Sequence, residues 1–228
     1  MHDAVKVRAP RVSRTDQAVA TRRRIVEAAG RFFVRDGYAA TTLQQIADDA
    51  GVAVQTVYFH FGNKRTLLKE LVDIASVGDD QPVALLDRPW VQELRTAPDG
   101  PETLAVWVRA SREIFARVAP ILRIVRDAAG SDPEMAAQWK TNQHQRHTAH
   151  RALAEILDAK DALRPGLTVD EAADILFALV SLEVYVLLTV ERGWAPEQWE
   201  RWAARTVSHA VLARPEPPDE LRAARTAT

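Results

Sequence analysis

At 228 residues, 47% of them hydrophobic, the chain is long enough to bury a substantial core, as one domain or as a small domain followed by a larger one. The net charge of −1 gives no overall sign of nucleic-acid binding, and the absence of Cys excludes disulfides, a thiolate nucleophile and cysteine zinc ligands. We find neither the apolar segment of a signal peptide nor about 18 uninterrupted apolar residues, so we expect a cytoplasmic protein without a membrane span.

Positive charge is concentrated towards the N-terminus. Residues 1–78 hold 12 Lys and Arg against 8 Asp and Glu, and the rest of the chain is acidic. We expect residues 1–16 to form a disordered basic arm, which fits both a merely solvated tail and a tail that touches phosphates. At the other end, three prolines within residues 214–228 predict a flexible tail.

Helical periodicity dominates the chain and strand-like alternation is scarce, so we predict an all-α fold. The first helix is expected from Thr21 to Asp36, with Gly37 as its stop. Its apolar residues recur at helical spacing and form one stripe on a helix otherwise rich in Arg. The members of the stripe are Ile25, Ala28, Ala29, Phe32 and Phe33.

The stretch from Thr41 to Phe61 predicts two short helices around a tight turn. Thr42 and Gln45 have the spacing of a capping box, and Gly51 supplies the positive φ that the turn requires. This pattern is typical of a DNA-binding helix-turn-helix, although for this segment alone a helix pair that merely packs is an alternative. With the first helix, the pair is expected to enclose a core. Its members are Phe32, Phe33, Ile46, Val52, Val57 and Phe61.

A denser set of motifs covers residues 20–70. In chain order they are Arg22-x-x-Ile25-x-x-Ala28-Ala29-x-x-x-Phe33, Gly37-Tyr38, Thr42, Ile46-Ala47, Ala50-Gly51-Val52 and Thr56-Val57-Tyr58-Phe59-His60-Phe61-x-Asn63-Lys64. This combination resembles the N-terminal domain of the TetR (tetracycline-repressor) family of bacterial transcription regulators. The resemblance implies a helix-turn-helix DNA-binding domain, expected at 17–63. It also implies a larger helical domain that binds a small molecule and dimerises, expected at 64–213.

The resemblance further implies which residues meet double-stranded DNA. Phosphate contacts, which set the register, are expected from Thr42, Tyr58 and Lys64. Bases are expected to be read by the exposed front of the third helix, where Gln55 suits adenine. Ala53 stands where the family often has Ser, so one cap and one phosphate contact are expected to be missing. The full set of expected DNA-binding residues is Arg22, Thr42, Gln44, Val54, Gln55, Thr56, Tyr58, His60 and Lys64.

Beyond this module the chain predicts further helices separated by Pro and Gly. A helix from about Lys64 to Ala75 begins in the DNA-binding module and ends beyond it, so it is the expected lever between domains. Breakers follow at residues 78–82 and 98–101. Pro120 is expected to end or kink the next long helix.

Three histidines on the following helix, His144, His147 and His150, invite a metal interpretation. Their spacing of three spreads them around the helix, so they do not converge well, and we expect polar helix surface instead. No cluster of His, Asp and Glu has ligand spacing. We therefore predict no metal, no cofactor and no enzymatic activity, leaving an all-helical enzyme as a remote alternative.

The segment from Ala172 to Val190 is almost wholly apolar and predicts a helix buried on every side. Together with a last helix it fits the family's dimerisation bundle, so we expect a homodimer through about residues 170–192 and 196–212. Glu183 and Tyr185 would then face either the dimer seam or a ligand cavity. Candidate lining residues for an unknown small-molecule effector, each also explicable as plain core, are Trp107, Arg112, Phe115, Trp139 and Phe177.

The sequence thus predicts a dimeric, sequence-specific DNA-binding transcriptional regulator, a repressor that a small molecule releases from a palindromic operator. A helical scaffold that binds only proteins is the alternative, but it needs neither the phosphate-contacting residues nor the basic arm. The sequence leaves open the effector, the operator, the regulated gene and whether the protein activates or represses.

Overall fold

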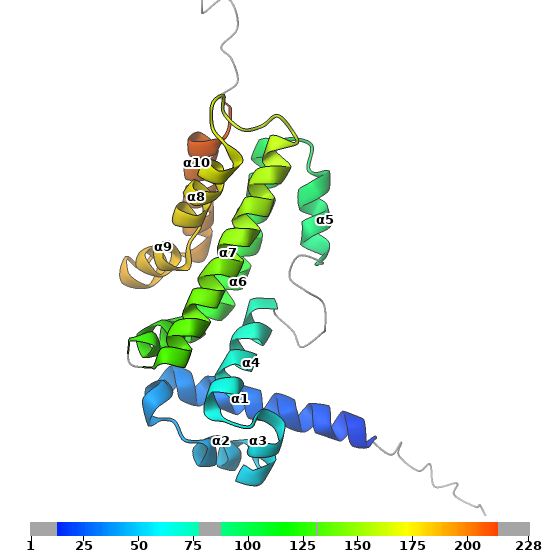
Figure 1. Ribbon diagram of the computed structural model, residues 1–228, viewed down its shortest axis with the longest axis vertical. Coiled ribbons are helices and arrows are strands. Elements are labelled where there is room, and N and C mark those ends of the chain that lie inside the picture. Colours follow the sequence, from blue (N-terminus) through cyan, green and yellow to red (C-terminus); the bar gives the residue numbers. More distant parts are fainter. Residues whose placement is uncertain (1–12, 78–87, 131, 214–228) are drawn as a thin grey trace, which may run out of the picture. The chain divides into compact units, whose positions relative to one another are not determined.

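A computed structural model describes residues 13–77, 88–130 and 132–213 (Figure 1). Within these ranges the regular elements are helices, together with an isolated antiparallel bridge between Leu163 and Leu212, and the predicted all-α fold is confirmed. The expected tail at 214–228 and residues 1–12 of the expected basic arm lie outside the described residues.

The chain divides into two compact units. The first comprises Met1–Asp73 and Pro120–Met135, and the second comprises Ile74–Ala119 and Ala136–Thr228. Most of helix α4 (Lys64–Val77) packs within the first unit, so this division into compact units falls ten residues after the domain boundary expected at residues 63 and 64. Its Leu71 lies against Gly30, and Glu70 forms an ion pair with Arg22 at 2.6 Å.

Helix α1 spans Arg14–Ala40 and is longer than expected. Ser13 caps it in a capping box with Asp16, so the helix begins seven residues before the expected start at Thr21 and takes in the end of the expected basic arm. Gly37, at φ 81°, breaks the helical backbone, and a last short helical stretch follows. The periodicity missed the first turns because residues 15–20 are exposed and carry no apolar stripe.

Helices α2 (Leu43–Ala50) and α3 (Val54–Phe61) form the expected pair. Thr42 and Gln45 make the predicted capping box, and Gly51 closes α2 at φ 65°. The predicted core positions Phe33, Ile46, Val57 and Phe61 are buried.

Two predicted members of this core are only half-buried, Phe32 and Val52. The Phe32 ring is covered on one face by the guanidinium of Arg35, 4.5 Å from the ring centroid, so it lies at the edge of the unit.

After α4, the next three described helices in chain order are α5 (Pro89–Thr96), α6 (Gly100–Ala129) and α7 (Pro133–Asp158). The prediction that a helix ends at Pro120 was wrong, because α6 continues through it. Pro120 removes one backbone bond, to the carbonyl of Ala116. Both residues are exposed, so water can take the place of the missing donor.

The predicted continuous apolar helix at 170–192 is divided in the structure. It consists of α8 (Val169–Leu179), α9 (Leu182–Val186) and a π-helix, η2 (Leu187–Glu191). The division falls at Val180 (φ −97°, ψ 63°), after which Ser181 caps α9 by accepting from the Val184 N–H at 3.1 Å. By length and composition the stretch Val169–Glu191 is apolar enough to cross a membrane, which is a weak indication on its own. Helix α10 (Pro196–Val211) packs against α8.

The turn between α2 and α3 gives a direct test of this fold. Replacing Gly51 with Ala places a Cβ at an ordinary contact distance of 3.9 Å from the Arg24 guanidinium but in the left-handed region, so we expect a loss of about 1 kcal/mol in the free energy of unfolding. Gly130→Ala is the matched control, since its Cβ is also unhindered and its φ is not positive. Urea unfolding followed by circular dichroism measures both, and equal stability of the two variants would contradict the role of the turn.

Candidate functional site

Helix α3 turns one side to the core and the other to solvent. Val57 and Phe61 are buried, whereas Gln55 is exposed, Tyr58 is 54% exposed and Phe59 is 86% exposed. The neighbouring exposed rings of Tyr58 and Phe59 form a small aromatic patch, which makes this side of α3 a candidate contact surface. Phe59 was absent from the predicted contact residues, although its place beside Tyr58, away from the buried Val57 and Phe61, could have indicated it.

The other predicted contacts of α3 and α2 lie around this face. Val54, Thr56 and His60 are half-exposed, and the His60 ring lies between those of Phe59 and Phe61. Ala53 provides no side-chain cap to α3, as expected. The exposed front of α3 is thus a surface of amide, hydroxyl, methyl and aromatic groups, which suits base edges in the major groove.

At the start of α2 the polar side chains form hydrogen bonds with one another and with the backbone of the same helix. Thr42 Oγ accepts from the Gln45 N–H at 3.2 Å, and the Thr42 N–H donates to Gln45 Oε1 at 2.8 Å. The amide of Gln44 donates to Asp48 at 2.7 Å. A phosphate at Thr42 would therefore take the place of the Gln45 side chain, and a base at Gln44 would take the place of Asp48.

Lys64 is engaged inside the first unit. Its ammonium donates to the carbonyls of Tyr38 at 2.7 Å and Thr41 at 2.8 Å and lies 4.4 Å from the centroid of the Tyr38 ring. Burial lowers the pKa of Lys64. These contacts join the end of α1 to the start of α4, so the structure gives Lys64 a positioning role in addition to the predicted phosphate contact.

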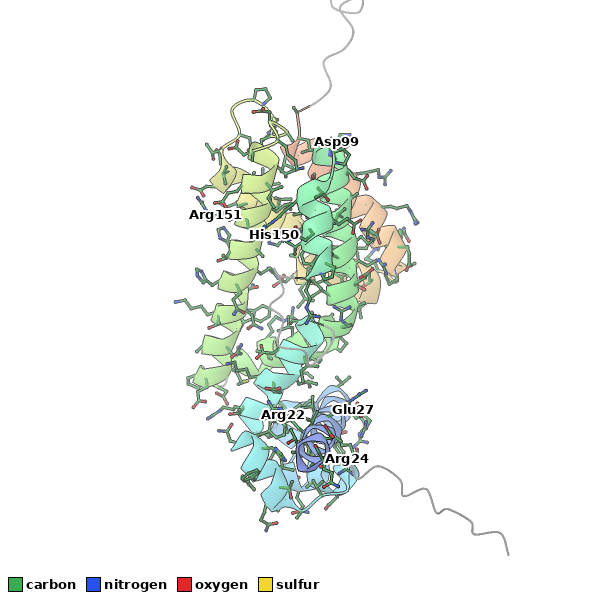
Figure 2. The ribbon with its side chains drawn as sticks, turned by 90° about the vertical axis from the view of Figure 1, so that its right-hand side faces the viewer. Arg22, Arg24, Glu27, Asp99, His150 and Arg151 are labelled. Atoms are coloured by element: carbon green, nitrogen blue, oxygen red, sulfur yellow. The ribbon has the colours of Figure 1, made fainter. Side chains whose placement is uncertain are left out.

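The arginines of α1 differ in availability (Figure 2). Arg22, a predicted DNA contact, pairs with Glu70 and lies 4.9 Å from the centroid of the Phe61 ring. Arg23 pairs with Glu27 at 2.9 Å. Arg24 is exposed, and its guanidinium lies beside the Gly51 turn, where an added Cβ would be 3.9 Å away. Arg24 was not among the predicted contact residues, because periodicity alone does not place an arginine next to a particular turn.

This arrangement coincides with a known domain. Residues 25–71 match the family model described as bacterial regulatory proteins, tetR family. Residues 25–71 thus carry the N-terminal domain of TetR-family regulators, and the resemblance seen in the sequence is confirmed for this domain.

Relatives extend the likeness unevenly along the chain. The regulator TtgR of Pseudomonas putida is 48% identical over 58 residues, which is 25% of this chain and 28% of that protein's length. The transcriptional repressor SCO4008 of Streptomyces coelicolor is 26% identical over 165 residues, covering 72% of this chain and 76% of the relative. Among solved structures, NalD, the secondary repressor of the MexAB-OprM multidrug efflux pump in Pseudomonas aeruginosa, has a TM-score of 0.64 at 25% identity, covering 86% and 98% of the two chains. Over 86% of its length the chain thus has the fold of NalD, although only 25% of the residues are identical.

The predicted effector-lining residues fall into separate groups within the second unit. The Trp107 ring contacts those of Trp90 and His150, and His150 in turn contacts Phe177. The other ring cluster consists of Phe115, Tyr185 and Trp199.

Arg112 and Trp139 belong to neither of these two ring clusters. Arg112 pairs with Glu200 at 2.5 Å, and Trp139 is half-buried on the first half of α7. Glu183, left open between seam and cavity, finds partners within the chain: Arg146 at 3.1 Å and Gln143 at 3.3 Å.

His150 corrects the prediction that the histidine series is polar surface. Its side chain is buried, with the residue 2% exposed, and burial lowers its pKa to about 4, against the raising effect of the Arg146 and Val180 carbonyls. His147 instead lies 3.0 Å from Asp174. In the described part of the chain no three His, Cys, Asp or Glu residues are grouped to hold a metal ion.

The buried imidazole makes stability depend on pH. Between pH 6.5 and about 4 the unfolded chain binds a proton at His150 and the folded chain does not, so stability is lost as pH falls through this window. The loss reaches about 3 kcal/mol. All six Trp residues lie at position 90 or later, so tryptophan fluorescence during urea unfolding reports on the second unit.

His150→Phe is the variant that isolates this effect. It removes the titration, and its stability should fall less than that of the unaltered chain between pH 7 and pH 4.5. Parallel pH profiles for the two proteins would show that His150 does not titrate as described.

Proposed function

We propose that this protein is a sequence-specific DNA-binding transcriptional regulator, acting in the cytoplasm as a repressor and not as an enzyme. The observation that carries the proposal is the solvent face of α3, with Gln55, Tyr58 and the 86% exposed Phe59 on a helix anchored by two buried side chains. The names of SCO4008 and NalD as repressors support the direction of regulation.

The contacts divide into those that position and those that specify. Tyr58, Thr42 and Arg24 reach phosphates, which fix the register without reading sequence. Gln55 reads adenine through its amide, while Val54, the Thr56 methyl and Phe59 contact thymine methyl groups. Lys64 and Arg22 hold the module together from within, and Lys64 reaches a phosphate only after giving up a carbonyl.

A homodimer is part of the proposal. The packed pair α8 and α10 supplies the dimer face, as predicted for the last two helices, and a two-fold pair of chains presents two copies of α3 to a pseudo-palindromic operator. The break at Val180 shortens the α8 contribution, so the face centres on α8 and α10.

Release from the operator follows from a conformational shift that a small molecule favours. Arg65, in the first turn of α4, pairs with Asp132 at 3.2 Å and Glu134 at 2.7 Å at the corner between α6 and α7. All three residues belong to the first unit, while the remainder of α6 and α7 belongs to the second. A shift along α6 or α7 therefore pulls on α4, which is the proposed lever.

The test compares two glutamine variants on DNA from the region upstream of the protein's own gene and on unrelated DNA, at several salt concentrations. Gln55→Ala should weaken binding to the upstream DNA about tenfold or more and leave the salt dependence unchanged, because it removes a base contact and no phosphate contact.

Gln92→Ala is the control, since Gln92 is exposed on α5 in the second unit. It should bind both DNAs like the unaltered chain. If the unaltered protein fails to bind either DNA even at low salt, the proposed function is wrong. Equal weakening on both DNAs by Gln55→Ala would assign that residue to the backbone instead.

A further inference from the structure

Three ring nitrogens in the second unit are buried without a hydrogen-bond partner among the described residues: Nε1 of Trp107 on α6, Nε2 of His150 on α7 and Nε1 of Trp199 on α10. The first two belong to rings that contact each other. The two residues are 6% and 2% exposed, and their ring centroids are 5.3 Å apart. Figure 2 shows His150 on the side of α7 that faces α6. Buried polar atoms are nearly always hydrogen-bonded, so a pair of such atoms side by side calls for an occupant.

The chemistry of the pair is set by a backbone contact. His150 Nδ1 lies 2.8 Å from the Arg146 carbonyl, an acceptor, so Nδ1 carries the proton and donates it. In the neutral ring Nε2 is then an acceptor, whereas indole Nε1–H of Trp107 can only donate. The two rings in contact thus carry one donor and one acceptor, which together suit a single small group that both accepts and donates.

The surroundings of the pair are aromatic. The Trp90 ring lies 5.8 Å from that of Trp107, and the Phe177 ring lies 6.1 Å from that of His150, both in edge-to-face geometry. Flat aromatic groups pack favourably among such rings.

The local charge is balanced. The Arg146 guanidinium, 4.4 Å from the centroid of the Phe177 ring, pairs with Glu183, and Gln143 also donates to Glu183. The positive charge near His150 is thereby neutralised within the chain, and His147 faces Asp174. A charged molecule would lose its hydration without gaining an unpaired counter-charge, so the surroundings select an uncharged one.

We propose that Trp107 and His150 form the polar end of a binding site for an uncharged aromatic molecule that carries a hydroxyl group. The hydroxyl donates to His150 Nε2 and accepts from Trp107 Nε1–H, and the aromatic body packs near Trp90 and Phe177. The proposal rests on the proposed function, in which this molecule is the effector. The competing occupant is a buried water, which satisfies the same two nitrogens.

Isothermal titration of the full chain with 2-naphthol and with its methyl ether tests the site. The ether keeps the aromatic body and the acceptor oxygen but cannot donate to Nε2. The unaltered protein should bind 2-naphthol at least about tenfold more tightly than the ether. Equal affinity for the two compounds, or no binding of 2-naphthol, overturns the proposal and leaves water as the occupant.

Three variants locate the effect. His150→Phe removes both imidazole nitrogens and Trp107→Phe removes the indole nitrogen, while each variant keeps an aromatic ring. Each should bring the preference for 2-naphthol close to one. Trp194→Phe is the control, because Trp194 contacts Trp202, outside the proposed site, and it should keep the preference. If His150→Phe fails to fold, as judged by circular dichroism, Trp107→Phe decides alone. An undiminished preference in a folded Trp107→Phe variant overturns the proposed geometry.

DNA binding by the same preparations, without 2-naphthol, separates this proposal from the proposed function. Loss of DNA binding with intact 2-naphthol preference would reject the regulator and keep the site. Selective DNA binding with no 2-naphthol preference would do the reverse.

Discussion

The proposed contact surface for DNA depends on the burial of one apolar stripe. Helices α2 and α3 have eight residues each, too few to be stable alone in water. They are held because Ile46, Val57 and Phe61 are buried in the same unit as the stripe of α1, with Ile25 and Phe33 fully enclosed. Since Val57 and Phe61 must face inward, Gln55, Tyr58 and Phe59 are directed to solvent. The side chains proposed to contact DNA are therefore positioned by buried side chains that face away from this surface.

Local features of this unit were predictable from the sequence. A capping box is a pattern of four adjacent residues and a left-handed turn needs Gly, so Thr42, Gln45 and Gly51 specify their own geometry. The TetR resemblance, confirmed by the family model, rests on the same short range. Features that depend on distant partners were missed. Lys64 binds carbonyls 23 and 26 residues away, and no periodicity reveals such a contact.

The second unit shows the same limit more clearly. His150 looked like helix surface because its neighbours are polar, but the rings of Trp107 and Phe177 enclose it, and both come from other helices. The break at Val180 was hidden by an apolar run that satisfies a helical pattern from end to end, although Ser181 has the chemistry of a cap. The fold match to NalD comes with only 25% identity, so the chemistry of the buried side chains in this unit must be inferred from those side chains themselves. In this unit, buried polar groups indicate a candidate binding site more clearly than apolar periodicity does.

The most direct test of the regulator is a footprint of the purified protein on DNA upstream of its own gene. Two recognition helices related by a two-fold axis should protect two half-sites of inverted sequence, with centres about 10 base pairs apart or a multiple of that distance. We predict that the unaltered protein protects this symmetric pair of half-sites and that the Gln55→Ala variant does not. Uniform protection without half-sites, or no protection at concentrations where the chain is folded, would contradict the reading surface on α3.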